Sequence, residues 1–194
     1  MSLTIDSKDD FNSIMLSSRV SIGKYLNFVK QEDRESIAKF VHERFSERYI
    51  TPLESTPKKN GFCIMANCCL MIEALESFYQ GWGDTQGRSE LAFCEFFDRA
   101  KEFWDFRGCS SEFYRNVRCA ILHQAESTGG WRIRRTGPLF NPDTLTINAT
   151  IFLRRLKKYL KEYQEGLKKA DWNSGMWNNL RKKMNTIINN CKRV

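Results

Sequence analysis

"GFCIMANCCLMIEAL" (residues 61–75) is the most apolar stretch of the chain and decides its fold class. Its side chains are apolar on nearly all sides of a helix, a pattern typical of a helix buried in a core. Asn67 and Glu73 interrupt the stretch, which is shorter than the roughly 18 to 20 apolar residues that cross a bilayer. We therefore expect a central core helix from about Phe62 to Tyr79, ending at a glycine-rich stretch, and no membrane span.

The chain on both sides of this segment is dominated by helical patterns. Apolar side chains recur at steps of three and four residues, which predicts amphipathic helices. Asp33 is suited to cap the second of them. We expect these helices at about residues 9–30, 33–50, 89–99, 110–127, 149–168 and 176–191.

Residues 129–148, GGWRIRRTGPLFNPDTLTIN, differ from this helical pattern. Two prolines, two adjacent glycines and two segments of alternating polarity predict a short two-stranded β-hairpin with a long tip. The predicted fold class is therefore all-α, a bundle of about six to seven helices with a small two-stranded β-hairpin insertion. We expect one domain over residues 1–194, with a core from about 10 to 190 and the insertion at about 130–148.

Composition restricts the class of partner and site. Thirty-one Lys and Arg against 23 Asp and Glu give a net charge of +8, which is compatible with a polyanionic partner such as RNA. Among the 7 cysteines there is no Cys-x2-Cys pair, and neither histidine has zinc-like spacing with them, so we expect no metal and no cofactor. The acidic, polar start MSLTIDSKDDF does not resemble a signal peptide, and we expect a cytoplasmic protein.

The helix predicted at 110–127, which we call the motif helix, contains RNVRCAILHQAES (115–127). At about 100° per residue, one face of this helix carries Asn116, Ala120, His123 and Ser127, and a separate, packed face carries Phe113, Val117 and Ile121. Arg118 lies about 140° around the helix from His123. The two side chains can therefore act together within one chain if Arg118 curls around the helix or if the helix ends near His123. A symmetric dimer, in which the motif helices of two chains face each other, is another solution.

The Arg-x4-His spacing of RCAILH (118–123), late in an all-helical bundle, resembles the HEPN superfamily of small helical domains, many of which are RNases. The core segment GFCIMANCCLMIEALESFYQGW and the continuation HQAESTGGW extend the resemblance, which covers about residues 10–190. Family members usually carry a polar residue directly after the arginine, where this chain has Cys119.

The resemblance implies metal-independent RNA cleavage, in which the ribose 2′-hydroxyl attacks the neighbouring phosphate. His123 would transfer protons, and Arg118 would be a fixed cation against the growing negative charge. Residues expected to support this pair, by orienting the ring or a phosphate or by pairing with an arginine, are Asn116, Cys119, Ser127 and Glu73. For Glu73 the arginine is either Arg115 or Arg118, as a structural partner or as support for the site.

The strand WRIRR offers contacts to an RNA backbone. Alternation places Arg132 and Arg134 on one face of the strand and Trp131 and Ile133 on the other. These two arginines, together with Arg115, are the expected RNA-binding residues. Trp131 could stack on a base, but burial against the bundle is the favoured interpretation for so large an apolar side chain.

Three functions are compatible with these patterns. The first is a homodimeric RNase of the defence or toxin kind, dimerising through the motif helices, with RNA and a cognate antitoxin or regulator as partners. The second is a catalytically inactive HEPN-like domain that binds RNA, a nucleotide or a protein partner. The third is an unrelated helical interaction module in which the motif is accidental.

Overall fold

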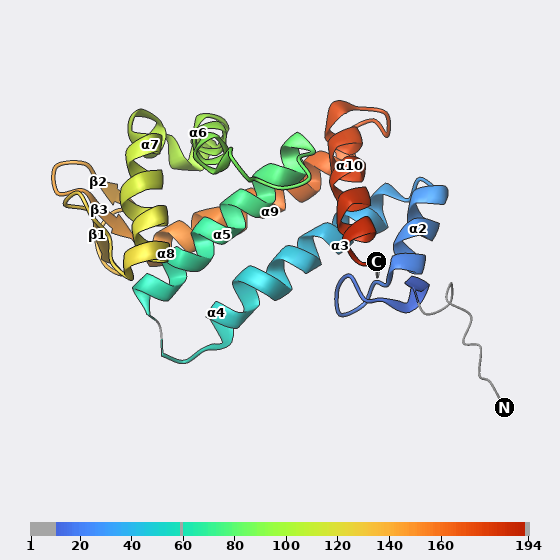
Figure 1. Ribbon diagram of the computed structural model, residues 1–194, viewed down its shortest axis with the longest axis horizontal. Coiled ribbons are helices and arrows are strands. Elements are labelled where there is room, and N and C mark those ends of the chain that lie inside the picture. The colour runs from blue at the N-terminus through green and yellow to red at the C-terminus, as the bar shows by residue number, and fades with distance from the viewer. Residues whose placement is uncertain (1–10, 59, 193–194) are drawn as a thin grey trace.

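The computed structural model describes residues 11–58 and 60–192, and over these residues the chain is a helical bundle with a small sheet (Figure 1). Its α-helices are α2 (Ile22–Lys30), α3 (Arg34–Phe45), α4 (Thr51–Ser55), α5 (Gly61–Gln80), α6 (Ser89–Arg99), α7 (Ser110–Phe113), α8 (Ala120–Gln124), α9 (Ala149–Lys169) and α10 (Gly175–Asn190). Segments with other helical windings are the π-helices η1 (Ser46–Ile50) and η3 (Tyr114–Cys119) and the 3-10 helix η2 (Lys101–Cys109). The strands are β1 (Arg132–Arg134), β2 (Phe140–Asn141) and β3 (Thr146–Asn148). The predicted fold class, a helical bundle with a small β insertion, is confirmed.

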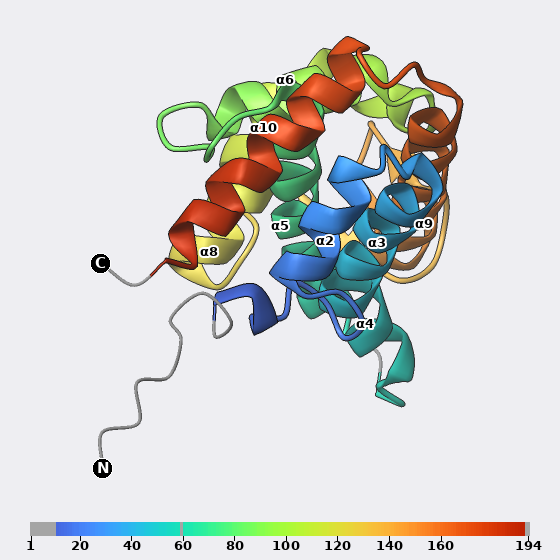
Figure 2. The same cartoon turned by 90° about the vertical axis from the view of Figure 1, so that its right-hand side faces the viewer.

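Two long helices, α5 and α9, pack against each other along the middle of the molecule (Figures 1 and 2). At one end lie α6, α7, α8 and the sheet, and at the other lie α2, α3 and α10. Both α10 and the motif helix pack on α5, while α3 packs on α9. The central helix thus connects the proposed motif with the opposite end of the bundle.

The central helix α5 is capped at both ends. The Asn60 side chain accepts hydrogen bonds from the backbone N–H groups of Phe62 and Cys63, and Gly81, with φ 68°, takes the left-handed conformation that ends the helix. By length and composition α5 could cross a membrane, which corrects the expectation that the stretch is too short. Its most apolar stretch is 61% buried inside the protein, as in a core helix of a helical bundle.

Glu76 of α5 is a fully buried carboxylate, 0% exposed. Arg99, at the end of α6, forms an ion pair with it and also donates a hydrogen bond of 3.0 Å to the hydroxyl of Tyr159 on α9. The Arg99 guanidinium stacks 3.6 Å from the ring centroid of Tyr79, and Gln80 donates a further hydrogen bond of 2.9 Å to Glu76. Because an unpaired buried carboxylate is costly, this network fixes α6 and α9 against α5.

Buried aromatic rings hold the elements around the motif helix together. The cluster joins α6, η2, α7, α9 and the sheet, and its members are Phe93, Phe96, Phe97, Phe103, Phe106, Phe113, Trp131, Phe140 and Phe152. Phe97 and Phe113 meet edge to face with ring centroids 5.0 Å apart, a favoured geometry for aromatic pairs. Phe113 thereby anchors the start of the motif helix in the core.

The helix expected over residues 9–30 is interrupted, and its first two residues lie outside the described part of the chain. A loop over residues 14–21 separates a helical turn from α2, whose N-cap is Ser21. In this loop the Ser17 hydroxyl accepts a hydrogen bond of 3.2 Å from the backbone N–H of Val20. Serine side chains compete with a helix for backbone groups in this way, which explains why apolar periodicity overestimated the helix.

The second helix begins as predicted. The Asp33 side chain caps α3 by accepting a hydrogen bond of 3.0 Å from the backbone N–H of Ser36. The helix continues through η1 to the predicted end at Ile50 and then through α4 to Ser55. Pro52 is tolerated there because it lies in the first turn of α4.

The insertion is a three-stranded sheet, so the predicted two-stranded hairpin is wrong. β3 is central; it pairs in parallel with β1, where Ile133 lies opposite Ile147, and antiparallel with β2, where Phe140 lies opposite Ile147. The two segments of alternating polarity, which form β1 and β3, therefore do pair, but they run parallel rather than antiparallel. Gly137, with φ 87°, helps the chain to turn back before β2, which supplies the antiparallel strand.

We expect Arg99→Met to lower the free energy of unfolding by about 3 to 5 kcal/mol, because it leaves the buried Glu76 without its ion-pair partner. Urea denaturation followed by far-UV circular dichroism measures this change. Arg154→Met, at an exposed position of α9, is the control and should stay within about 0.5 kcal/mol of the wild type. Equal stability of the two variants would show that the buried pair does not hold α6 in place.

Candidate functional site

The motif helix is built from α7, η3 and α8 and ends at Gln124 rather than at Ser127. It ends because Ala125 takes the left-handed conformation, with φ 56°, which an α-helix cannot continue through. Ser127 therefore lies in the loop that follows the helix, and not on the helical face predicted for it.

The middle of the motif helix is π-helical over six residues, Tyr114–Cys119. A π-helix closes its hydrogen bonds over five residues, so the angle of about 100° per residue does not apply there. Ala120 is 2% exposed whereas His123 is exposed, and the single polar face predicted to include both is wrong. Val117, which is 0% exposed, and Ile121, which packs against the core, confirm the predicted packed face.

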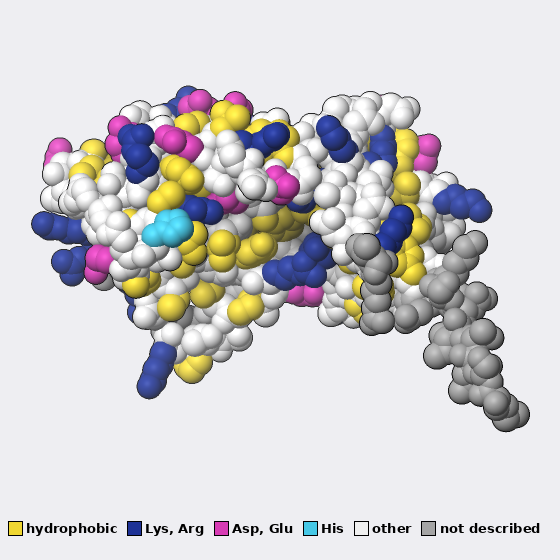
Figure 3. Space-filling view, in the orientation of Figure 1, with side chains coloured by type: hydrophobic (Ala, Val, Ile, Leu, Met, Phe, Trp, Pro, Cys, Tyr) yellow, Lys and Arg dark blue, Asp and Glu magenta, His cyan; other side chains and the backbone are white. Residues whose placement is uncertain are grey.

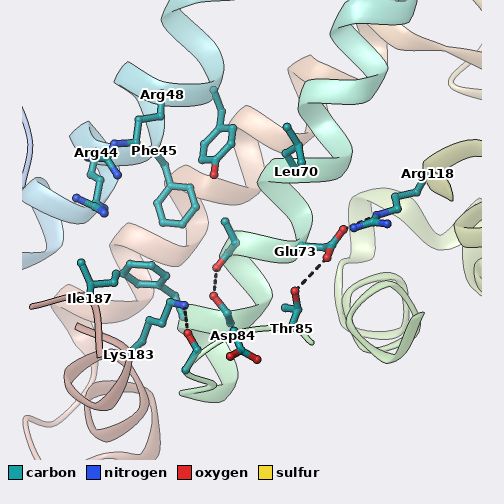
Figure 4. A pocket seen from close by; sticks show the side chains of 15 residues that line it. Arg44, Phe45, Arg48, Leu70, Glu73, Asp84, Thr85, Arg118, Lys183 and Ile187 are labelled. Atoms are coloured by element: carbon teal, nitrogen blue, oxygen red, sulfur yellow. Dashed lines mark hydrogen bonds and ion pairs between the residues drawn. The ribbon is translucent and has the colours of Figure 1, made fainter. Parts of the chain in front are cut away.

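Arg118 points from the motif helix toward α5 and forms an ion pair with Glu73 (Figure 4). Of the two arginines predicted as partners of Glu73, it is therefore Arg118 and not Arg115. Arg118 Nε lies 2.6 Å from Glu73 Oε1, and the Thr85 hydroxyl donates a hydrogen bond of 3.1 Å to Glu73 Oε2. The guanidinium also lies 5.6 Å from the ring centroid of Tyr114, and its Nη1 is 4.0 Å from Cys119 Sγ. These contacts fix the direction of the guanidinium.

The charge of Arg118 is stabilised by the same partner. Burial alone would favour the neutral form, but the hydrogen bond and the negative charge of Glu73 outweigh it and raise the pKa of Arg118. Arg118 is therefore a permanently charged group with a defined orientation, as a site for an anionic phosphate requires.

His123 lies on the exposed side of α8, near the end of the motif helix. Among the described residues it has no hydrogen-bond or ion-pair partner, and no such contact joins it to Arg118. Within one chain, the two predicted reacting groups are therefore not joined by a hydrogen bond or an ion pair.

Asn116 and Ser127, predicted to support the site, stabilise the loop after the motif helix. Asn116 Oδ1 accepts a hydrogen bond of 3.1 Å from the Thr128 hydroxyl, and its backbone oxygen accepts one of 2.9 Å from the Thr128 N–H. The Ser127 hydroxyl donates a hydrogen bond of 2.8 Å to the Trp131 carbonyl. In this chain neither side chain contacts His123.

The predicted RNA-binding arginines lie on the surface in two separate places. Arg115 is 3.5 Å from Glu90 and 3.7 Å from Glu112, so its charge is partly satisfied by neighbouring acids. Arg132 and Arg134 are exposed on β1, at one edge of the sheet. The latter two remain available for a phosphate backbone.

Trp131 is buried, with 4% of its surface exposed, which confirms the favoured prediction and excludes base stacking. Its ring stacks on that of Phe140, with centroids 5.3 Å apart and an interplanar angle of 12°. The ring of Phe113 meets it edge to face at 5.9 Å. Trp131 therefore attaches the sheet to the motif helix.

A cavity of about 420 Å³ lies between α3 with η1, α5, the loop at 83–85, η3 and α10. On the face shown in Figure 3 the middle of the molecule is hollowed, with hydrophobic side chains in the hollow and Lys or Arg side chains beside it. Four cationic and two carboxylate side chains line the cavity, so positive charge is in excess. The cations are Arg118, Arg44, Arg48 and Lys183.

Arg44, Arg48 and Lys183 were missed in the sequence. Arg44 and Arg48 are four residues apart and so share a helical face, which is a detectable signal, but such pairs are common on solvent faces. Nothing local indicates that Lys183 of α10 meets them. Among the described residues, no group of three or more His, Cys, Asp or Glu side chains is placed to hold a metal ion.

A second, smaller cavity of about 70 Å³ lies between α5, Arg118 and α8. It shares Arg118 and Leu70 with the large cavity, and its lining includes Leu122, the residue before His123. Leu70 and Leu122 are 52% and 59% exposed, which is high for leucine. An apolar surface patch therefore adjoins the motif.

We expect Glu73 and Arg118 to be coupled in stability while His123 is not. In a double-mutant cycle of Glu73→Gln and Arg118→Gln, the coupling energy should be about 1 to 3 kcal/mol, because each charge loses a largely buried partner. His123→Ala should change the free energy of unfolding by less than about 0.5 kcal/mol, because the side chain is exposed. Additive effects of the first pair in urea denaturation would contradict the ion pair.

Comparison with the models of known protein families, with curated proteins and with solved structures finds no match to this chain. The resemblance to the HEPN superfamily therefore depends on the Arg-x4-His spacing and the helical pattern alone.

Proposed function

We propose that this chain is a metal-independent endoribonuclease of the defence or toxin kind, with Arg118 and His123 as its reacting groups. The observation that carries the proposal is the placement of Arg118, whose guanidinium is held by Glu73 at the boundary of two cavities. A fixed cation beside open space suits a phosphate whose negative charge grows during reaction. His123, exposed five residues further along the same helix, is the side-chain type best suited to proton transfer near neutral pH.

The proposed reaction involves only the protein, the RNA and water. The ribose 2′-oxygen forms a bond to the adjacent phosphorus while His123 accepts the hydroxyl proton. The bond from phosphorus to the 5′-oxygen breaks, and that oxygen takes up a proton from the partner subunit's His123 or from water. The products are a 2′,3′-cyclic phosphate and a 5′-hydroxyl end.

The proposal includes a homodimer formed through the motif helices. Arg118 is held toward α5 by Glu73 while His123 is exposed to solvent, and a second chain facing the first would supply a further His123 to the same phosphate. The exposed Leu70 and Leu122 beside the motif provide apolar surface for such a contact. A two-fold axis through this patch would place the His123 side chains of both chains in one cleft.

The remaining partners belong to the same proposal. Arg132 and Arg134, exposed on β1, together with Arg115, would contact the RNA backbone. A cognate antitoxin or regulator would act by covering these cations or the motif helix. The proposed location is the cytoplasm, where the seven free cysteines stay reduced.

A second candidate is a HEPN-like domain that binds RNA, a nucleotide or a protein partner without catalysis. One observation favours it: Glu73 already neutralises Arg118, and Cys119 stands beside it where a polar residue is usual in the family. An arginine satisfied in this way can position a ligand without stabilising a transition state.

We expect the purified protein to cleave labelled RNA in excess EDTA and to leave cyclic-phosphate ends. His123→Ala should lower the rate by about 10²- to 10⁴-fold, because it removes the proton-transfer group without disturbing the fold. Gln124→Ala, at an exposed position of the same helix, is the matched control and should retain cleavage. Inert wild type, or equal rates for wild type and His123→Ala, would leave the binding domain as the better description.

We expect the wild-type chain to be a dimer in solution and Leu122→Lys to make it a monomer, because a charge would be placed in the apolar contact. Size-exclusion chromatography with light scattering measures the mass directly. Leu91→Lys, which changes a leucine of α6 that is 46% exposed, is the control and should remain dimeric. A monomeric wild type would rule out the composite site.

A further inference from the structure

The large cavity contains positive charge that no carboxylate among the described residues neutralises by ion pairing. Arg44 and Arg48 both donate hydrogen bonds to one acceptor, the Leu16 carbonyl oxygen, the latter at 3.1 Å. Lys183 donates a hydrogen bond of 2.7 Å to the Gly83 carbonyl. In the part of the chain that the structure describes, none of these three cations forms a salt bridge.

The proximity of these cations is unfavourable without a counter-charge. Burial, followed by the positive charge of Arg48, lowers the pKa of Arg44 to about 10. Burial also lowers the pKa of Lys183, and Arg44 adds to this effect although Asp84 opposes it. A bound anion would relieve both the repulsion and part of the cost of burial.

The acidic side chains that line the cavity form no ion pair with these three cations, although Asp84 attracts Lys183 from a longer range. Glu73 is engaged by Arg118 and Thr85 on the opposite side of the cavity from Arg44 and Arg48 (Figure 4). Asp84 is exposed and accepts a hydrogen bond from the backbone N–H of Gln86. The cavity is therefore asymmetric, with balanced charge on one side and unbalanced cations on the other.

Aromatic side chains line the cavity between these two sides. The rings of Phe45 and Tyr49 are stacked, with centroids 5.8 Å apart and an interplanar angle of 29°, and Phe78 meets Phe45 edge to face at 5.1 Å. Leu70 and Ile187 add aliphatic surface. A volume of about 420 Å³ lies within the range of small-molecule sites.

We propose that this cavity binds a small phosphate-bearing ligand with a planar ring, of the nucleoside monophosphate class. The phosphate would contact Arg44, Arg48 and Lys183, and the ring would lie against the aromatic wall at Phe45 and Tyr49. Two guanidinium groups and an ammonium from two helices line the same cavity, and three such cations match the several oxygens of a phosphate better than the two of a carboxylate. The site is distinct from the proposed reaction centre, because none of these cations belongs to the reacting pair.

The test is titration calorimetry of the full chain with adenosine monophosphate, inorganic phosphate and adenosine, without RNA. The monophosphate should bind at least about tenfold more tightly than either of its parts, because only it uses both the cations and the aromatic wall. Arg48→Gln and Lys183→Gln should each weaken it by about tenfold or more. Arg154→Gln removes one positive charge from an exposed position of α9 and should bind like the wild type.

His123→Ala separates this site from RNA cleavage, because it should keep full affinity for the monophosphate even if it abolishes the nuclease. Far-UV circular dichroism shows whether each variant is folded. If Arg48→Gln does not fold, Lys183→Gln tests the proposal, because this substitution removes only a hydrogen bond to an exposed loop. The proposal is overturned if the wild type does not bind the monophosphate. It is also overturned if both cavity variants bind it as tightly as Arg154→Gln.

Discussion

Glu73 and Glu76 lie three residues apart on α5, a largely apolar helix, and each is neutralised by an arginine from a different element. A carboxylate removed from water without a partner costs several kcal/mol, so α5 can be buried only where both arginines reach it. Arg99 thereby fixes α6, and Arg118 fixes the π-helical part of the motif helix. The position of this whole end of the bundle depends on two ion pairs made by one helix turn.

The same pairing divides the large cavity into two chemically different sides. On the side of the motif helix, Glu73 forms an ion pair with Arg118, which orients the guanidinium and offsets part of its attraction for an anion. On the side of α3 and α10, the cations Arg44, Arg48 and Lys183 donate hydrogen bonds only to carbonyl oxygens among the described residues. The proposed anion would therefore favour the second side, although Arg118 is the residue that the sequence motif identifies. Charge compensation, and not the presence of an arginine, decides where an anion binds.

Local patterns account for the features that were predicted from the sequence. The core helix, the Asp33 cap and the pairing of Glu73 with an arginine of the motif helix follow from periodicity, capping and the cost of burying a carboxylate. The features that were missed depend on contacts between distant segments or on backbone winding. Parallel pairing of β1 with β3 requires the chain to reverse direction between them, and the alternation of polar and apolar residues does not encode this reversal. The π-helix in the motif helix shifts side chains relative to their positions on an ideal α-helical wheel. The presence of Lys183 in the same cavity as Arg44 and Arg48 depends on how α10 packs on α5, which no single segment specifies.

The orientation of the motif helix determines whether each proposed site needs one chain or two. Arg118 cannot swing toward His123 without breaking its bond to Glu73 and leaving that carboxylate, largely buried, without an ion-pair partner. Moving Arg118 to assemble the reacting pair therefore costs more free energy than bringing a second chain to the site. The anion site, by contrast, takes all its cations from one chain. Oligomeric state thus separates the two proposals physically: dissociation into monomers would remove the reaction centre and leave the ligand cavity complete.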